Sequence, residues 1–353
     1  MRFTNFWTYH KIVFSKAFAA AVWHARKNVL ADAVGDPPPF GPYMAEFDVT
    51  YRCNCRCQMC QRWLDPKPNE LTVAEYKKLA KTFQRMGVHQ VSIAGGEPLV
   101  RDDVFEVIKG FAACNMSVNL CTNGLLLSSL CDQVCQSGAT CITVSVDGVE
   151  PDTHDAIRGY QGGYIKILKG LEEIMKRPAN QRPVVRVRMT INADNQNEIK
   201  RFYSKFKPMV DDVLLQPVHL CQDAFYDSTK PESLDLNPVV LSQQIKKTPW
   251  KKDGYLPGLI DALSNSGAYP KQNCYAGVLM VRIDPWGNVY PCLEQHDRIG
   301  SIRDTDFETL WHSDRFNQQR HYLANGRKCV CWYNNTAVIG HYGDILKQTR
   351  LKR

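Results

Sequence analysis

The stretch Tyr51-Arg52-Cys53-Asn54-Cys55-Arg56-Cys57-Gln58-Met59-Cys60 places Cys53, Cys57 and Cys60 at the spacing C-x3-C-x2-C. Thiolates this close together converge on one metal centre, and cysteine thiolates bind both zinc and iron–sulfur clusters. Three ligands are one too few for a four-iron cluster, so one iron would stay open to another molecule. The alternative is a zinc loop that recruits a fourth ligand, for which Cys55 is the candidate.

Around this loop, strands alternate with amphipathic helices. We expect strands over 44–50, 90–94, 116–121, 140–146, 184–190 and 213–218, and helices over 73–86, 104–113, 125–136, 165–176 and 198–206. Such alternation indicates a parallel sheet with helices outside it. A closed eight-unit barrel needs about 250 residues, so the pattern predicts an α/β fold, a partial (β/α)6 TIM barrel. In such folds the chemistry lies at the C-terminal ends of the strands.

The composition is that of an ordinary globular protein, with 353 residues, 44% of them hydrophobic and 23% charged. This excludes collagen-like, wholly disordered and small disulfide-stapled chains. The apolar stretch 17–23 is shorter than the roughly 20 residues of a membrane span. It also lacks the continuous apolar core of a signal peptide. We therefore expect a cytoplasmic protein whose fourteen cysteines are thiols or metal ligands.

The net charge of +8 is concentrated in residues 1–40 and 320–353, whereas the centre is close to neutral. A nucleic-acid-binding protein more often carries a basic face on its folded body, so we expect no nucleic acid partner. Basic ends favour an acidic partner or a membrane surface. Residues 6–34 have helical apolar spacing, which predicts a helix packed on the main domain or, alternatively, a peripheral membrane contact. The prolines at 37–39 end it as a stiff linker.

Polar motifs follow several of the predicted strands. They are Gly95-Gly96-Glu97-Pro98, Thr122-Asn123-Gly124, Ser145-Val146-Asp147-Gly148, His154-Asp155-Ala156-Ile157-Arg158-Gly159 and Thr190-Ile191-Asn192. Each alone is typical of a turn or a cap. Glycines also allow close backbone approach, and an arginine fork suits a carboxylate. Their order on successive strands favours a binding site.

The cysteine loop and these motifs together resemble the radical SAM superfamily, over residues 44–220. The resemblance implies a [4Fe–4S] cluster on Cys53, Cys57 and Cys60 whose open iron binds S-adenosylmethionine (SAM). The reduced cluster then cleaves SAM to a 5′-deoxyadenosyl radical, which abstracts hydrogen from a substrate. Relatives usually have an aromatic residue where this chain has Met59, although methionine also packs on flat rings. The implied SAM contacts are Met59, Gly95, Gly96, Glu97, Pro98, Asn123, Ser145, Asp147, Arg158, Thr190 and Asn192.

A second cysteine module follows, with the pattern C-x12-G-x4-C from Cys274 through Gly287 to Cys292, and then Cys329-Val330-Cys331. The turn-forming sequence 284–287 predicts a β-hairpin, and 306–323 a helix. The pattern resembles the SPASM extension of radical SAM enzymes, or its shorter twitch form. That implies one auxiliary [4Fe–4S] cluster on the four cysteines. The spacing C-x-C departs from the usual C-x-x-C, which leaves an open iron as an alternative. A structural zinc site is another.

The expected organisation is an N-terminal helix with its linker (1–40), a radical SAM core (41–224), a connecting segment (225–271) and a SPASM/twitch domain (272–353). Most other cysteines are predicted to be core residues. Cys221, directly after the sixth strand, is the exception, because some radical SAM epimerases have a thiol hydrogen donor at the barrel mouth.

The resemblance implies oxidation or bond formation, assisted by the auxiliary cluster. Few residues precede the core, compared with the leader-binding domain of many peptide-modifying relatives. We therefore expect a small-molecule or lipid-like biosynthetic intermediate as substrate. The alternative is a peptide maturase that cross-links or epimerises residues, and a remote alternative is a non-catalytic zinc-binding protein. The expected electron donor is an acidic flavodoxin or ferredoxin, steered by the basic ends of the chain.

Overall fold

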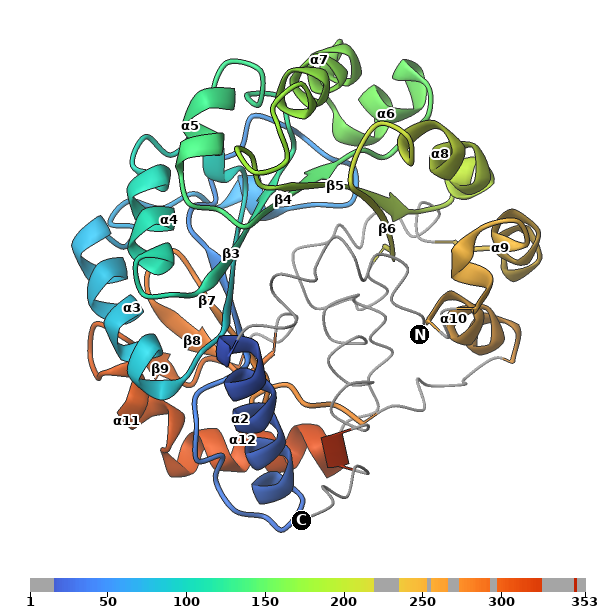
Figure 1. The fold of residues 1–353 in the computed structure, drawn as a ribbon. Helices are drawn as coiled ribbons and strands as arrows, with labels where there is room; N and C mark the ends of the chain where they lie inside the picture. The colour runs from blue at the N-terminus through green and yellow to red at the C-terminus, as the bar shows by residue number, and fades with distance from the viewer. Residues whose placement is uncertain are drawn as a thin grey trace.

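The strands form one curved, open sheet in the order β6-β5-β4-β3-β2-β1-β7-β8-β9 (Figure 1). The structure, a computed structural model, describes residues 16–218, 235–252, 255–265, 273–292, 297–325 and 346–347. Strands β1 to β6 pair in parallel, which confirms the predicted partial barrel. The strands are Met44–Asp48 (β1), Gln90–Ala94 (β2), Ser117–Thr122 (β3), Cys141–Ser145 (β4), Val184–Ile191 (β5), Asp212–Pro217 (β6), Met280–Ile283 (β7), Asn288–Tyr290 (β8) and Gly300–Ser301 (β9).

Helices α3 to α8 lie along the outer side of the sheet (Figure 1). The helices are Lys16–Asp32 (α2), Val73–Met86 (α3), Val104–Ala112 (α4), Cys131–Gln136 (α5), Pro151–Arg158 (α6), Gly163–Met175 (α7), Ile199–Phe206 (α8), Pro238–Ile245 (α9), Tyr255–Ser264 (α10), Phe307–Trp311 (α11) and Asp314–Asn325 (α12). The predicted bounds of α3 are confirmed at both ends. There, Thr72 and Glu75 form a capping box, and Gly87 ends the helix with a φ of 76°.

Other predicted helices differ from those observed. The helix predicted over 125–136 begins only at Cys131, and the helix α6 was not predicted. The helix predicted over 306–323 is two helices, because Ser313 accepts a hydrogen bond from the backbone N–H of Phe316 and so begins α12 anew. The connecting segment contains α9 and α10 rather than one short helix.

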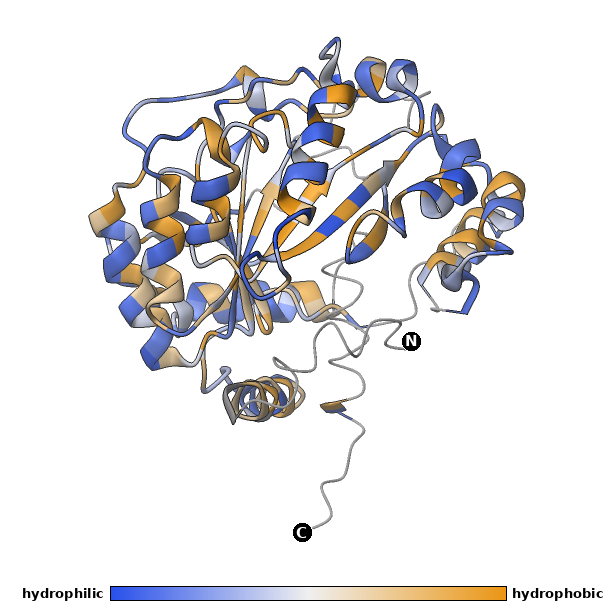
Figure 2. Ribbon diagram, turned by 45° about the horizontal axis from the view of Figure 1, so that its top comes forward, coloured by the Kyte–Doolittle hydropathy of each residue, from blue (hydrophilic) through white to orange (hydrophobic). Residues whose placement is uncertain are grey.

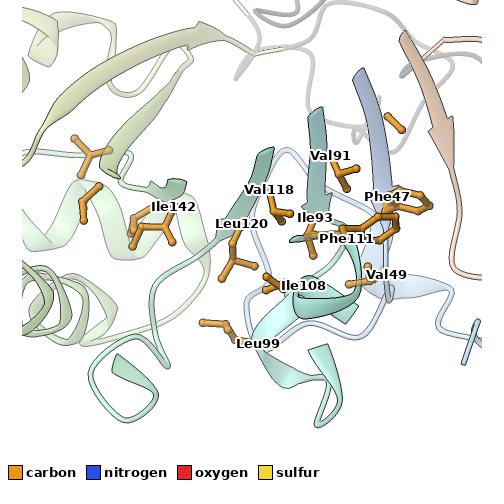
Figure 3. Packing of buried hydrophobic residues seen from close by; sticks show 14 of the residues in the cluster. Phe47, Val49, Val91, Ile93, Leu99, Ile108, Phe111, Val118, Leu120 and Ile142 are labelled. Carbon is orange, nitrogen blue, oxygen red and sulfur yellow. The ribbon is translucent and has the colours of Figure 1, made fainter. Parts of the chain in front are cut away.

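The main core lies between the sheet and its outer helices. Phe47, Ile93 and Leu120 point from neighbouring strands towards Ile108 and Phe111 of α4 (Figure 3). Because side chains alternate along a strand, the opposite side of the sheet carries the residues between these. Those residues are largely polar, among them Glu46, Asp48, Ser92, Asn119, Thr143 and Arg188. Hydrophilic residues accordingly interrupt the hydrophobic strands in Figure 2.

The predicted C-terminal hairpin is present and extends the barrel sheet. Asp284 Oδ1 accepts hydrogen bonds from the backbone N–H groups of Trp286 and Asn288, both at 2.9 Å, which shapes the turn. Strand β7 pairs in parallel with β1, with Met280 opposite Met44. Strands β7, β8 and β9 then pair antiparallel. The hairpin therefore touches the strand that leads into the cysteine loop.

Helix α2 packs across the foot of the barrel through Ala25 and Val29. Asn28, fully buried on this helix, donates to the carbonyl oxygen of Gly41 at 2.9 Å and accepts from the backbone N–H of Phe40 at 3.0 Å. These bonds fix the linker after the helix. Within the described ranges, no helix has the length and hydrophobicity to cross a membrane.

Candidate active site

One cavity of about 990 Å³, part of it open to solvent, lies at the C-terminal ends of the parallel strands. The cysteine loop and strands β1 to β6 contribute its walls. The lining residues are Glu46, Cys53, Cys55, Cys57, Met59, Cys60, Arg62, Trp63, Ala94, Gly95, Gly96, Cys121, Thr122, Asn123, Ser145, Arg158, Arg188, Thr190 and Gln216. The cavity thus brings together ten of the predicted site residues.

The cysteine loop is held against the C-terminus of α6. The backbone N–H groups of Arg56 and Gln58 donate to the carbonyl oxygens of Arg158 and Ile157, at 3.1 and 2.9 Å. Gly159 has a φ of 60°, and a Cβ there would lie 2.3 Å from the Arg56 carbonyl oxygen. A glycine is required at this contact for both reasons.

The four thiols of the loop differ in their hydrogen bonding. The Cys53 sulfur accepts a hydrogen bond from the backbone N–H of Cys55 at 3.4 Å. Hydrogen bonding to Cys53 and Cys57 raises the pKa of the buried Cys55 thiol. The hydrogen bond from Cys55 lowers the pKa of Cys57 to about 6, and the Arg158 guanidinium adds to this effect against the opposing effect of burial. Cys55 is therefore a donor to the neighbouring sulfurs.

As placed in the structure, Cys53, Cys57 and Cys60 are not grouped around a single point. Among the described residues, no group of three histidine, cysteine, aspartate or glutamate side chains could hold a metal ion. In a four-iron cluster each cysteine binds a different iron, so the sulfurs need not converge on one point. Cys53, Cys57 and Cys60 all line the cavity.

The Gly95–Gly96 turn lies directly beneath the cysteine loop. A Cβ on Gly95 would be 2.4 Å from the Thr50 carbonyl oxygen, and one on Gly96 would be 2.3 Å from that of Arg52. The backbone N–H of Gly96 donates to the Thr50 carbonyl oxygen at 2.7 Å. The two segments therefore form a single backbone surface facing the cavity.

Glu97 lies behind this surface rather than on the cavity wall. Its carboxylate is 1% exposed. It accepts hydrogen bonds from the backbone N–H groups of Leu99 and Asn123, at 3.0 and 2.6 Å, and from the Thr122 hydroxyl at 2.7 Å. Burial raises its pKa to about 6. The carboxylate thus joins the ends of β2 and β3.

Arg158 reaches the cavity from α6. Its Nε lies 2.6 Å from Oδ2 of the fully buried Asp147, and its Nη1 lies 3.7 Å from the Cys57 sulfur. Asp147 Oδ1 accepts from the backbone N–H of Thr190 at 2.7 Å. Its own backbone N–H donates to Nδ1 of His154 at 3.0 Å. Asp147 therefore aligns Arg158 and the end of β5 from behind the wall.

The remaining predicted residues also fall into two groups, those on the cavity wall and those buried behind it. Met59, Asn123, Ser145 and Thr190 line the cavity, whereas the side chains of Pro98 and Asn192 are buried outside it. In the second module, Cys292 belongs to a buried apolar cluster that includes Tyr275, and the partly buried Cys274 packs against this cluster. Three predicted residues, Cys221, Cys329 and Cys331, lie outside the described residues.

Several lining residues were missed, notably Glu46, Arg188 and Gln216. Their signal in the sequence was a charged or amide side chain inside an apolar strand, at the positions that alternate with the core residues. Gln216 is 5% exposed, and its Oε1 has no hydrogen-bond partner among the described residues. A buried acceptor on a cavity wall suits a polar ligand such as SAM.

A partial (β/α) barrel whose cysteine loop faces a polar cavity is the architecture of an iron–sulfur radical enzyme. A family model of the radical SAM superfamily matches residues 47–206, and the SPASM iron-sulfur cluster-binding domain matches 274–332. The chain belongs to the radical SAM superfamily and carries a SPASM domain. Its cofactors are accordingly SAM and [4Fe–4S] clusters.

Two relatives match most of the chain. Mycofactocin maturase MftC of Mycolicibacterium smegmatis is 28% identical over 305 residues, which cover 82% of this chain and 75% of that protein. AdoMet-dependent heme synthase of Oleidesulfovibrio alaskensis is 24% identical over 316 residues, which cover 82% and 80%.

Two solved structures share the fold. Streptococcus suis SuiB bound to SAM has a TM-score of 0.67 at 13% identity, covering 95% of this chain and 83% of that one. The enzyme anSMEcpe with bound AdoMet has a TM-score of 0.60 at 17% identity, covering 81% and 86%. At these identities the likeness concerns the fold.

Proposed function

We propose that the cavity binds SAM beside a [4Fe–4S] cluster held by Cys53, Cys57 and Cys60, and that hydrogen abstraction from a substrate takes place there. When bound and reduced, such a cluster would supply the electron that breaks the sulfonium carbon–sulfur bond of SAM, which yields methionine and the abstracting 5′-deoxyadenosyl radical. The observation that carries this proposal is the convergence of the cysteine loop, the Gly95–Gly96 turn and the ends of β3 to β6 on one cavity.

The chain's own residues would bind and orient SAM. The backbone surface at Gly95 and Gly96 accommodates its methionine amino group, and Arg158 offers a guanidinium for its carboxylate. Ser145, Thr190 and Asn123 supply polar groups along the same wall. Glu97 and Asp147 act through these residues, because their carboxylates are already bonded within the protein.

The first measurement uses anaerobically reconstituted protein. It determines iron and sulfide per chain and the 5′-deoxyadenosine released from SAM under dithionite. About eight irons with 5′-deoxyadenosine formed would support two four-iron clusters, the auxiliary one on Cys274, Cys292, Cys329 and Cys331. About four irons with product would make the second module a zinc or structural site. A protein with neither iron nor SAM cleavage would contradict the proposal.

For the substrate we favour a compact polar molecule or a lipid-like molecule with a polar head. Opposite charges, Glu46 and Arg188, line the cavity beside the predicted SAM wall. The heme synthase relative carries the name of a small-molecule product. Transfer of deuterium from labelled candidate substrates into 5′-deoxyadenosine would identify the molecule. Failure of all small candidates, with transfer from a peptide, would reject this choice.

A peptide maturase is the second candidate. Mycofactocin maturase matches the chain over most of its length, and SuiB, which shares the fold, was solved with its precursor peptide SuiA. The discriminating experiment incubates the enzyme with peptides encoded near its gene and follows mass changes. Cys221 as a hydrogen donor belongs to this candidate. If it donates, epimerisation in D2O would place deuterium at the inverted carbon, and Cys221→Ala would abolish inversion.

The proposed electron donor is an acidic flavodoxin or ferredoxin. Exposed basic side chains lie in and next to the cysteine loop. Arg52 is 52% exposed and pairs with Glu70, Lys67 is 57% exposed and pairs with Asp65, and Arg56 is exposed within the loop. Turnover with a natural donor should fall as salt increases, whereas turnover with dithionite should change little. Equal salt sensitivity with both reductants would count against this surface. Peripheral membrane contact by α2 stays a prediction, for which the supporting feature is Trp23, 47% exposed with Lys27 over its ring.

A further inference from the structure

Asp48, the last residue of β1, is a buried carboxylate between two arginines. It is 0% exposed, and neither oxygen has a hydrogen-bond partner among the described residues. Arg62 Nη2 lies 3.4 Å from Oδ1, and Arg282 Nη1 lies 3.9 Å from Oδ2. A buried charge requires compensation, and these two guanidinium groups provide it.

The two arginines come from the two parts of the protein that carry cysteines. Arg62 follows Cys60 by two residues and lines the cavity. Arg282 belongs to β7 of the SPASM hairpin, is 1% exposed, and its guanidinium lies 4.3 Å from the centre of the Tyr290 ring. Asp48 therefore joins the end of the cysteine loop to the second module through charge.

The neighbourhood of Asp48 supports this connection. The Tyr51 ring meets the Trp286 ring edge-on, with 5.1 Å between their centres. The Tyr290 hydroxyl donates to Asp284 Oδ2 at 3.1 Å in the hairpin turn.

We propose that Asp48 is a positioning and charge-balancing residue, which fixes the cysteine loop against the SPASM hairpin and offsets the charges of the half-buried Arg62 at the cavity and the buried Arg282 behind it. The inference rests on the proposed cluster at Cys53, Cys57 and Cys60. Reduction adds one negative charge to such a cluster, and nearby charge in a low-dielectric site changes its potential. Asp48 disfavours reduction of the cluster, whereas Arg62 and Arg282 favour it.

The test is an anaerobic redox titration of reconstituted holoenzyme followed by electron paramagnetic resonance. The core cluster is recognised by the change in its signal when SAM is added. Asp48→Asn should raise the midpoint potential of this cluster, because two positive charges lose their counter-ion. Arg62→Gln and Arg282→Gln should lower it. Arg62→Lys should stay close to the wild type, because the charge is retained.

Shifts of the midpoint potential in opposite directions distinguish this role from a merely structural one. In a structural role, every variant would loosen the site and change the potential in the same direction. The control is Asp132→Asn, which removes an exposed carboxylate paired with Arg177. Shifts of one sign for the Asp48 and arginine variants, or unchanged potentials with lowered melting temperatures, would overturn the inference. If Asp48→Asn loads no iron, the arginine variants carry the same test. A wild-type protein without a SAM-sensitive signal would refute the proposed function instead.

Discussion

The backbone N–H of Asn123 donates a 2.6 Å hydrogen bond to the buried carboxylate of Glu97. This bond holds the turn after β2 against the end of β3. It thereby fixes the position of Gly95 and Gly96 at the cavity. Glu97 belongs to a motif that is typical of a binding site, but here its carboxylate has a structural role: it holds two strand ends together behind the cavity wall.

Glu97→Ala should weaken SAM binding about tenfold. The substitution leaves the N–H groups of Leu99 and Asn123 and the Thr122 hydroxyl without their acceptor. A buried group left in this state costs about 1–3 kcal/mol. Anaerobic calorimetry with SAM measures the effect, and Glu106→Ala on the exposed face of α4 is the control. Unchanged affinity would show that the turn keeps its shape without the carboxylate.

Gly96→Ala should prevent assembly of the core cluster. Its Cβ would lie 2.3 Å from the Arg52 carbonyl oxygen, so the cysteine loop has to move. Gly162→Ala is the matched control. It pays a cost of about 1 kcal/mol for its left-handed backbone, but its Cβ meets nothing within 4 Å. Iron per chain after reconstitution separates the two, and a fully loaded Gly96→Ala protein would argue against close contact.

Cys60→Ala should abolish SAM cleavage, whereas Cys55→Ala should keep the core cluster. Cys55 is 2% exposed and hydrogen-bonded to neighbouring sulfurs, which fits a supporting thiol rather than a ligand. Iron content and 5′-deoxyadenosine formation are measured for both variants. Loss of iron in Cys55→Ala would make Cys55 a ligand of the cluster rather than a supporting thiol.

Cys292→Ala should reduce the iron content from about eight to about four per chain and leave SAM cleavage without substrate in place. Cys292 is buried in the second module, away from the cavity lining. Cys141→Ala, a buried cysteine of β4, is the control and should keep all the iron. Unchanged iron in Cys292→Ala would remove this residue from the auxiliary ligand set.

Acidification should destabilise the protein through His154. Burial, and next the charge of Arg158, lower its pKa to about 3. Its Nδ1 accepts the Asp147 N–H, for which the ring has to be neutral. Below pH 6.5 the His154 imidazole is protonated in the unfolded chain but stays neutral in the folded protein. The free energy of unfolding therefore falls as the pH decreases. The loss between pH 7 and pH 5.5 is about 1 kcal/mol. Denaturant unfolding of wild type against His154→Asn, which keeps an acceptor, measures this contribution. Equal pH dependence of both proteins would exclude it.

The barrel and much of its wall could be predicted because their signals are local. Strand β2 and helix α3 follow from periodicity, and the Thr72–Glu75 capping box marks the start of α3. The spacing of the cysteine loop placed Cys53, Cys57 and Cys60 on a site. What periodicity could not decide was which motif residues face the cavity. The carboxylates of Glu97 and Asp147 do not face the cavity. They accept hydrogen bonds that connect neighbouring strand ends behind its wall.

Two further features depend on contacts that are distant in the sequence. In the sequence, Glu46 and Arg188 look like ordinary charged residues. Only the curvature of the folded sheet brings both of them to the same cavity. Asp48 could not be assigned before Arg62 and Arg282 were known to lie on either side of it.

The pairing of β7 with β1 affects how this protein folds during its synthesis. On the ribosome, β1 emerges among the first elements, yet its partner at Met280 is synthesised only after the entire barrel. During that interval one edge of β1 is open, and such an edge invites pairing with other chains. Synthesis that stops before the hairpin would therefore yield an aggregation-prone product rather than a shortened enzyme.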